Sequence, residues 1–237
     1  VTAGHLAWVG LRRDSPDRVR AATRRVIAHG ADAVKVVTSG GTMTAGSNPS
    51  RPQFSAEELR IVVTEAHRLG KRVVAHALNA VSIASCVEAG VDSVDHVHWA
   101  APDGGDGFDV STAEALVRRG TNVGMTGSGW TRDLLAEDPE ALIHRFRHHR
   151  TLREMGAHLT LHTDAGSTGT AFDGIVASMR VLMAATDCSA AEALWSVTEG
   201  GAQAIGKDDV GHLEPGAHAD FIATMTSPAD DLAALDA

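Results

Sequence analysis

The sequence lacks tyrosine, has two cysteines, and has few aromatic residues, which make up 4% of its 237 residues. Cys86 and Cys188 form no CxxC or Cys/His spacing, which excludes a zinc finger or a disulfide framework. Both thiols are expected in the core of a protein from a reducing compartment. The absence of tyrosine means that any phenolic hydrogen-bond donor must come from elsewhere.

The chain also lacks runs of lysine or arginine, and its formal net charge is -9. A nucleic-acid or anionic-membrane surface is therefore not expected. No apolar run reaches the roughly 18 residues of a membrane-spanning helix, and the first residues do not have the pattern of a signal peptide. We expect a cytoplasmic protein whose partners are small molecules. The chain opens on Val1 and not on Met, which leaves open that an upstream part was removed or never included.

Short β-branched runs alternate with segments of helical period, which predicts βα units and a parallel sheet. The expected strands are 33–38, 73–76, 93–98, 122–126 and 158–164. The expected helices are 17–29, 56–69, 80–89, 112–119, 139–155, 173–185 and 190–204. Capping-box patterns begin two of these helices at Ser55 and Ser189, and glycines end four of them at positions 30, 70, 90 and 120.

Five βα units cannot close an eight-stranded barrel. The chain is therefore either an open doubly wound sheet or the C-terminal portion of a TIM barrel. A long loop, 39–53, follows the first expected strand at its carboxyl end, where both architectures place their active sites.

Polar residues interrupt the expected strands near their carboxyl ends. These residues are Lys35, His76, His96, His98 and Asp164. A single histidine on a strand is usually a core residue, but parallel strands bring successive ends to one rim. Imidazole and carboxylate groups are typical ligands of zinc and similar divalent metals. The pattern predicts a metal site, with Asp164 facing a metal or a water molecule held by one.

Several stretches, taken in order, resemble the metal-dependent amidohydrolase superfamily. They are "GADAVKVVTSGG", "AHRLGKRVVAHALN", "EAGVDSVDHVHW", "LHTDAG" and "DDVGHLEPGAHADFIA". The resemblance is to the branch with imidazolonepropionase-like enzymes and Xaa-Pro dipeptidases. It implies an α/β fold, a TIM (β/α)8 barrel to which this chain supplies about strands 4–8, plus a C-terminal strand of a small β-sandwich. The implied domains are 1–208, a partial barrel, and 209–237, the segment that returns to the sandwich.

The resemblance also implies a site with one or two divalent metals, usually zinc. Lys35 matches a lysine that CO2 converts to a bridging carbamate, and His76 and His96 match ligands of the second metal. Asp164 matches an aspartate that contacts the first metal and serves as general base and acid. His5 matches a histidine that reaches the substrate, although a surface-loop histidine is the alternative. The implied reaction is attack of metal-bound hydroxide on a carbonyl.

The sequence departs from the family pattern because no His-x-His pair precedes Lys35. His98, two residues after His96, is a substitute ligand or a hydrogen-bonding neighbour, and His162 is a further inward-facing candidate or a barrel-interior residue. A missing N-terminal barrel portion is therefore expected as a second chain or a removed segment. Without it, two open sheet edges predict aggregation or an oligomer.

The leading functional hypothesis is hydrolysis of a C–N bond in a small amide, dipeptide or cyclic amide. One alternative is a catalytically silent half-barrel that serves binding or assembly, and another is the same scaffold acting on a phosphotriester or lactone. Trp130 and Arg132, in the loop 127–138, are candidates for stacking on or pairing with an acidic substrate. The alternative is that they are packing and surface residues. His144, His148 and His149 are expected at the surface.

Overall fold

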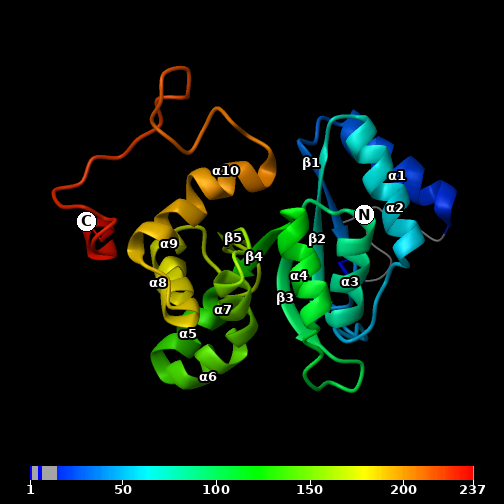
Figure 1. The fold of residues 1–237 in the computed structure, drawn as a ribbon, viewed down its shortest axis with the longest axis horizontal. Helices are drawn as coiled ribbons and strands as arrows, with labels where there is room; N and C mark the ends of the chain where they lie inside the picture. Colours follow the sequence, from blue (N-terminus) through cyan, green and yellow to red (C-terminus); the bar gives the residue numbers. More distant parts are fainter. Residues whose placement is uncertain (2–4, 7–14, 237) are drawn as a thin grey trace. The chain divides into compact units, whose positions relative to one another are not determined.

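Figure 1 shows a computed structural model of the chain that describes residues 1, 5–6 and 15–236. The chain divides into two compact units, Val1–Val123 and Gly124–Ala237, called unit 1 and unit 2. Among the described residues, no helix is both long enough and apolar enough to cross a membrane. The expected domain boundary at residues 208 and 209 rests on the resemblance and stays a prediction.

The sheet of unit 1 consists of parallel strands in sequence order. They are β1 (Ala33–Val37), β2 (Arg72–Asn79) and β3 (Ser93–Ala100). Val37 pairs with His76, and His76 pairs with Asp95 on the other side. The end of β1 therefore lies level with the interior of β2 and β3, and the predicted parallel sheet is confirmed. The first residues of β4 (Asn122–Thr126) follow, where the Asn122 amide donates to the Asp92 carbonyl at 2.9 Å.

Four helices follow one another beside this sheet. They are α1 (Pro16–Ala28), α2 (Ala56–Arg68), α3 (Ala80–Ala89) and α4 (Val110–Arg119), and each contacts the next (Figure 1). The core of unit 1 includes the fully buried Val34 and Val36. Lys35 lies between these two valines, and because side chains alternate along a strand it points away from that core. Its half-exposed side chain therefore lies on the other face of the sheet.

The predicted helix signals are confirmed. Ser55 accepts a hydrogen bond from the Glu58 amide while Glu58 accepts one from the Ser55 amide, a complete capping box, and Ser189 and Glu192 form another. Gly90 and Gly120 end α3 and α4 in the left-handed conformation that glycine adopts most readily.

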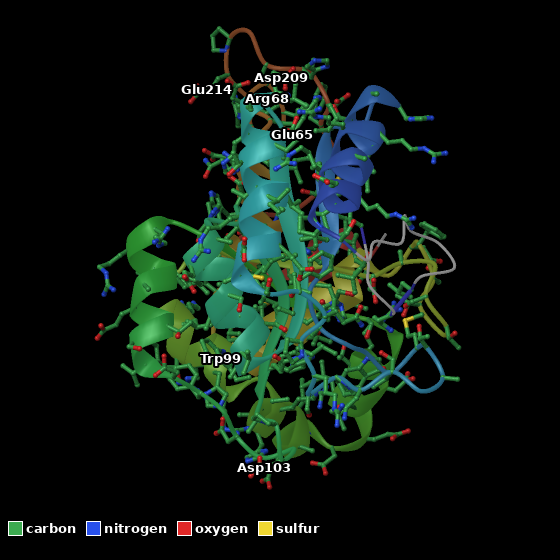
Figure 2. The ribbon with its side chains drawn as sticks, turned by 90° about the vertical axis from the view of Figure 1, so that its right-hand side faces the viewer. Glu65, Arg68, Trp99, Asp103, Asp209 and Glu214 are labelled. Atoms are coloured by element: carbon green, nitrogen blue, oxygen red, sulfur yellow. The ribbon has the colours of Figure 1, made fainter. Side chains whose placement is uncertain are left out.

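A charged cluster joins α1 to α2. The Glu65 carboxylate accepts hydrogen bonds from Arg24 at 2.6 Å and from Arg68 at 2.5 Å. Figure 2 shows Glu65 and Arg68 near one end of α2. The hydrogen bonds from Arg24 and then Arg68 lower the pKa of Glu65 to about 2. The anion is thus favoured in the folded state.

We expect this cluster to make stability depend on pH. Because the pKa of Glu65 is lower in the folded chain, its stabilisation is present above the unfolded value of 4.5 and lost as the pH falls toward 2. The stability difference between the wild type and Glu65→Gln, measured by urea denaturation, should therefore shrink between pH 5 and pH 2.5. Glu57→Gln, on the exposed side of the same helix, is the control. A difference that is constant over this range contradicts the prediction.

Unit 2 contains the rest of β4 and the neighbouring β5 (Leu159–His162). The Gly127 amide, just after β4, donates to the His162 carbonyl at 2.8 Å. The helices are α5 (Gly129–Glu137), α6 (Pro139–Arg145), α7 (Arg147–Glu154), α8 (Ile175–Thr186), α9 (Ala190–Val197) and α10 (Glu199–Ile205), and Leu232–Leu235 form a short 3-10 helix. α8 contacts α5, α6, α7, α9 and β5, so it is the centre of the unit.

Three expectations for unit 2 were wrong. The expected helix 139–155 is broken at Phe146, which is fully buried with a non-helical ψ of 14°. The expected helix 190–204 is broken at Thr198, whose ψ is −105°. The expected loop 127–138 contains α5, which the glycines of "TGSGW" concealed because glycine disfavours helices.

The predicted C-terminal strand is absent. Residues 219–224 form neither helix nor strand, and Phe221 and Ile222 are 70% and 75% exposed. A strand requires a neighbouring backbone to satisfy its hydrogen bonds, and no other strand pairs with this segment among the described residues.

Candidate functional site

Unit 1 brings four histidines into a row. The ring centroids of His5 and His76 are 5.2 Å apart, and those of His76 and His96 are 4.6 Å apart in an edge-to-face arrangement. The His98 ring lies 6.3 Å from that of His96. Three of these rings come from the adjacent strands β2 and β3. The predicted meeting of His76 and His96 is therefore observed, with His98 and His5 beside them.

His76 is fixed on both its main chain and its ring. Its carbonyl accepts hydrogen bonds from the amide and the hydroxyl of Thr38, at 2.9 Å and 2.7 Å. Its Nε2 lies 3.2 Å from the Gly40 carbonyl, which can only accept, so Nε2 carries the proton. Nδ1 is then the ring nitrogen with a lone pair. The hydrogen bond from Nε2 to Gly40 thus fixes the orientation of the ring, as in metal-binding histidines.

Burial lowers the pKa of His76 to about 4. The positive charge of Lys35 and the proximity of His5 act in the same direction, whereas the Gly40 hydrogen bond and Asp95 oppose the shift. The imidazole is therefore neutral at neutral pH. Neutral imidazole is the form that binds a metal.

Lys35 contacts a partner that the sequence analysis did not single out. Its ammonium group pairs with the carboxylate of Asp95, which is only 5% exposed. As an ammonium ion Lys35 can form this pair, whereas a carbamate on the same nitrogen would be an anion and could not. An aspartate within the apolar stretch "SVDHVH" was the available signal for this partner, since a carboxylate is costly to bury alone.

The backbone of β3 departs from regular strand geometry beside these rings. His96, Val97 and Trp99 have φ values of +72°, +46° and +56°. For residues other than glycine this region costs on the order of 1 kcal/mol or more each. Trp99 is fully buried and packs edge-to-face on Phe108 at 4.9 Å, which holds the segment in place. Such strain is concentrated at functional sites in proteins.

His5 is 2% exposed, so the surface-loop alternative was wrong. Its amide donates to the Gln53 side-chain oxygen at 3.1 Å. A Cβ atom at Gly41 would lie 2.2 Å from His5 Nε2, so only glycine at position 41 leaves room for the ring. The loop after β1 thus positions His5 against His76. Whether His5 contacts a substrate stays a prediction.

Asp164 and His162 belong to unit 2. Asp164 follows β5, is exposed, and has a φ of +55°; its carbonyl accepts a hydrogen bond from the Ser167 amide at 3.1 Å. His162 is half-buried, with Nε2 3.2 Å from the Thr160 hydroxyl. The expected surface position of His149 was wrong, because it is 1% exposed and packs on Phe146.

Trp130 and Arg132 have different neighbours in unit 2. They lie two residues apart on α5, and such residues do not share a helix face. Trp130 is 46% exposed and lies beneath the Arg145 guanidinium at 4.7 Å. Arg132 instead packs against Gly174. A substrate-binding role for Trp130 and Arg132 stays a prediction.

The donor set fits a metal only in part. Among the described residues, no group of three or more histidine, cysteine, aspartate or glutamate side chains is arranged to hold a metal ion. His76 and His96 nevertheless offer two imidazoles whose rings are 4.6 Å apart, one of them neutral with its proton on Nε2. Two nitrogen ligands suit zinc, which takes three or four protein ligands. The remaining ligands must come from elsewhere.

Comparison with known proteins gives a consistent result. Residues 3–236 match the model of the amidohydrolase family. Ochratoxinase from Aspergillus niger is 41% identical over 87 residues, which are 37% of this chain and 18% of that protein. Imidazolonepropionase from Salinispora tropica is 29% identical over 181 residues, 73% of this chain and 41% of that protein.

Solved structures have the same fold. The crystal structure of Aspergillus niger ochratoxinase matches with a TM-score of 0.79 and 27% identity, covering 94% of this chain and 51% of that one. A Xaa-Pro dipeptidase with bound methionine in its active site matches with a TM-score of 0.75 and 24% identity, covering 95% and 56%. The chain thus spans less than half of these curated relatives and about half of these solved chains.

Proposed function

Because the chain belongs to the amidohydrolase family, we propose that it carries part of the active site of a hydrolase that cleaves a C–N bond in a small amide, dipeptide or cyclic amide. The observation that carries the proposal is the pair of imidazoles, His76 and His96, whose rings meet on the adjacent parallel strands β2 and β3. Enzymes built on parallel sheets place their reacting groups toward the carboxyl ends of the strands. The names of the relatives, an ochratoxinase and an imidazolonepropionase, support a hydrolase.

His76 and His96 would hold a divalent metal, zinc in our proposal, together with Asp164 and a carboxylated Lys35. When bound, such a metal activates water and polarises a carbonyl. His76 contributes a neutral ring whose proton is on Nε2, so its Nδ1 is the donor. A carboxylated Lys35 would first have to leave Asp95.

Asp164 is proposed as the proton carrier. Its exposed carboxylate, at the turn after β5, can accept a proton from the attacking water and deliver it to the leaving nitrogen. His5 is proposed to contact the substrate, since it is fixed beside His76 by Gly41 and Gln53.

We further propose that the sheet is part of a TIM barrel of the amidohydrolase type, completed by an N-terminal portion that supplies the His-x-His ligands. The coverage of 51% of the ochratoxinase chain supports this proposal. The second candidate is a catalytically silent half-barrel for binding or assembly. It is favoured by the absence of a group of three potential metal ligands among the described residues.

Metal binding is the first test. Zinc affinity of the 237-residue chain, measured by calorimetry, should fall about 100-fold in His76→Asn and in His96→Asn, as expected for loss of one of few ligands. The matched control is His144→Asn, an exposed histidine of α6 that should bind zinc like the wild type. Zinc binding that is absent in the wild type, or unchanged in both site variants, would favour the silent module.

A further inference from the structure

Asp95 is a buried charged group that takes no part in the proposed reaction. It lies within β3 with its side chain 7% exposed, and its carboxylate pairs with the ammonium group of Lys35, whose side chain is 49% exposed. A carboxylate buried to this extent is stable as an anion only beside a cation. The pair therefore holds Lys35 as an ammonium ion, the form in which its nitrogen has no lone pair.

The register of the sheet places Lys35 and Asp95 on the same face as His76. Lys35 is opposite Val74 on β2. His76, two residues further along β2, is opposite Asp95 on β3. Residues two apart on a strand share a face, as do residues opposite each other on neighbouring strands, so the lysine side chain crosses β2 to reach Asp95. After burial, which is the main cause, the positive charge of Lys35 lowers the pKa of His76 and Asp95 raises it, so both charges lie close to that ring.

The strained backbone at His96 brings a second imidazole to this face. In a regular strand the side chains of Asp95 and His96 would point to opposite faces of the sheet. The positive φ of His96, +72°, interrupts this alternation, and the His96 ring lies 4.6 Å from that of His76. Asp95 therefore belongs to the face that carries the proposed metal ligands, and its negative charge acts there.

Carboxylation of Lys35 would reverse the charge that Asp95 faces. A bond forms between Nζ and the carbon of CO2, one C=O bond of CO2 becomes a C–O⁻ bond, and the ammonium nitrogen releases two protons to the solvent. A cation thus becomes an anion, the carbamate. The nitrogen needs a lone pair for this reaction, and the ion pair with Asp95 opposes its formation. The carbamate would then face a buried carboxylate of the same sign, so both effects disfavour the modification while Asp95 is an anion.

We propose that Asp95 controls the carboxylation of Lys35: the lysine stays an ammonium ion while Asp95 is its anionic partner, and it takes up CO2 once that negative charge is neutralised. This inference rests on the proposed function, which includes a carboxylated Lys35, and adds the residue that regulates the modification. Carboxylation is then a property of the pair and not of the lysine alone. Asp95 is a positioning residue in this role, because it acts on the site through Lys35.

The test measures carbamate formation directly, in the 237-residue chain kept metal-free with a chelator. Each protein is equilibrated with ¹³C-labelled bicarbonate, and the carbamate carbon is observed by NMR for the wild type, Asp95→Asn and Asp95→Ser. Adding Lys35→Arg to Asp95→Asn identifies the Lys35 signal as the one that is lost, since Lys71, Lys207 and the amino terminus are unchanged. Glu57→Gln, which removes an exposed carboxylate of α2, is the control for net charge. Thermal unfolding identifies the folded variants, and Asp95→Ser replaces Asp95→Asn if the latter does not fold.

We expect the ratio of carboxylated to unmodified Lys35 to be about tenfold higher in Asp95→Asn than in the wild type. This value is at the lower end of the effect of a neighbouring charge, because the lysine side chain is half exposed. Glu57→Gln should match the wild type. A Lys35 signal as strong in the wild type as in Asp95→Asn overturns the proposal, as does its absence from a folded neutral variant. A signal that depends on Asp95, in a protein that hydrolyses no amide when combined with the N-terminal portion, would support control by Asp95 while refuting the proposed reaction.

Discussion

Replacing Asp164 by asparagine is expected to reduce the rate of amide hydrolysis by about a thousandfold, within the range of 10²–10⁴ for general acid–base catalysis. The carboxylate can exchange a proton with water and the leaving nitrogen, whereas an amide cannot. Asparagine tolerates the left-handed backbone at this position, where φ is +55°, so the turn after β5 should be preserved. The measurement is kcat on a dipeptide, made with the zinc-loaded chain and the N-terminal portion that completes the barrel.

The matched control is Asp173→Asn, a neutralised carboxylate at the other end of the same loop, which should retain wild-type kcat. Because Asp164 is exposed, the thermal unfolding of Asp164→Asn should be close to that of the wild type. A variant that is folded and hydrolyses the dipeptide within tenfold of the wild-type rate would show that the proton is carried by another group.

Lys35→Met is expected to destabilise unit 1 by about 1–3 kcal/mol, because it leaves the buried carboxylate of Asp95 without its cation. The expected cost is below that of a fully buried pair, since the lysine side chain is half exposed and solvent screens its charge. The measurement is urea denaturation at pH 7.

Adding Asp95→Asn to Lys35→Met should recover part of the lost stability, because the amide that replaces the carboxylate needs no counter-charge. Comparison with the Asp95→Asn single variant completes the double-mutant cycle. Additive effects of the two substitutions would mean that the ion pair contributes nothing to folding. In that case the role of Lys35 would lie in the site alone.

The parallel sheet of unit 1 was predictable because its signals are local. Runs such as "AVKVV" and "VVAH" give the strands, and Ser55 and Gly90 begin and end helices through hydrogen bonds to residues three or four positions away. The breaks at Phe146 and Thr198 were not predictable, because the helical pattern of the sequence continues through both. Burial of Phe146, a tertiary effect, overrides the local preference there.

The sequence predicts which strands carry the candidate site residues, but it does not predict which of their side chains contact one another. Parallel pairing of neighbouring strands was sufficient to predict that His76 and His96 come together. The pairing of Lys35 with Asp95 depends on the register between strands that are not adjacent in the sheet. No local pattern in the sequence predicts that register. Likewise, the separation of Trp130 and Arg132 depends on α5, whose glycine-containing start concealed it.

The left-handed residues of β3 limit how the chain can be re-engineered. Stability-driven redesign would replace Val97 first, because a β-branched residue at a φ of +46° is among the least favourable choices for its backbone. Glycine there would relax the main chain between His96 and His98 and free both rings from the present row. A thermostable version of this protein should therefore be sought with positions 96–99 held constant and the helices of both units varied.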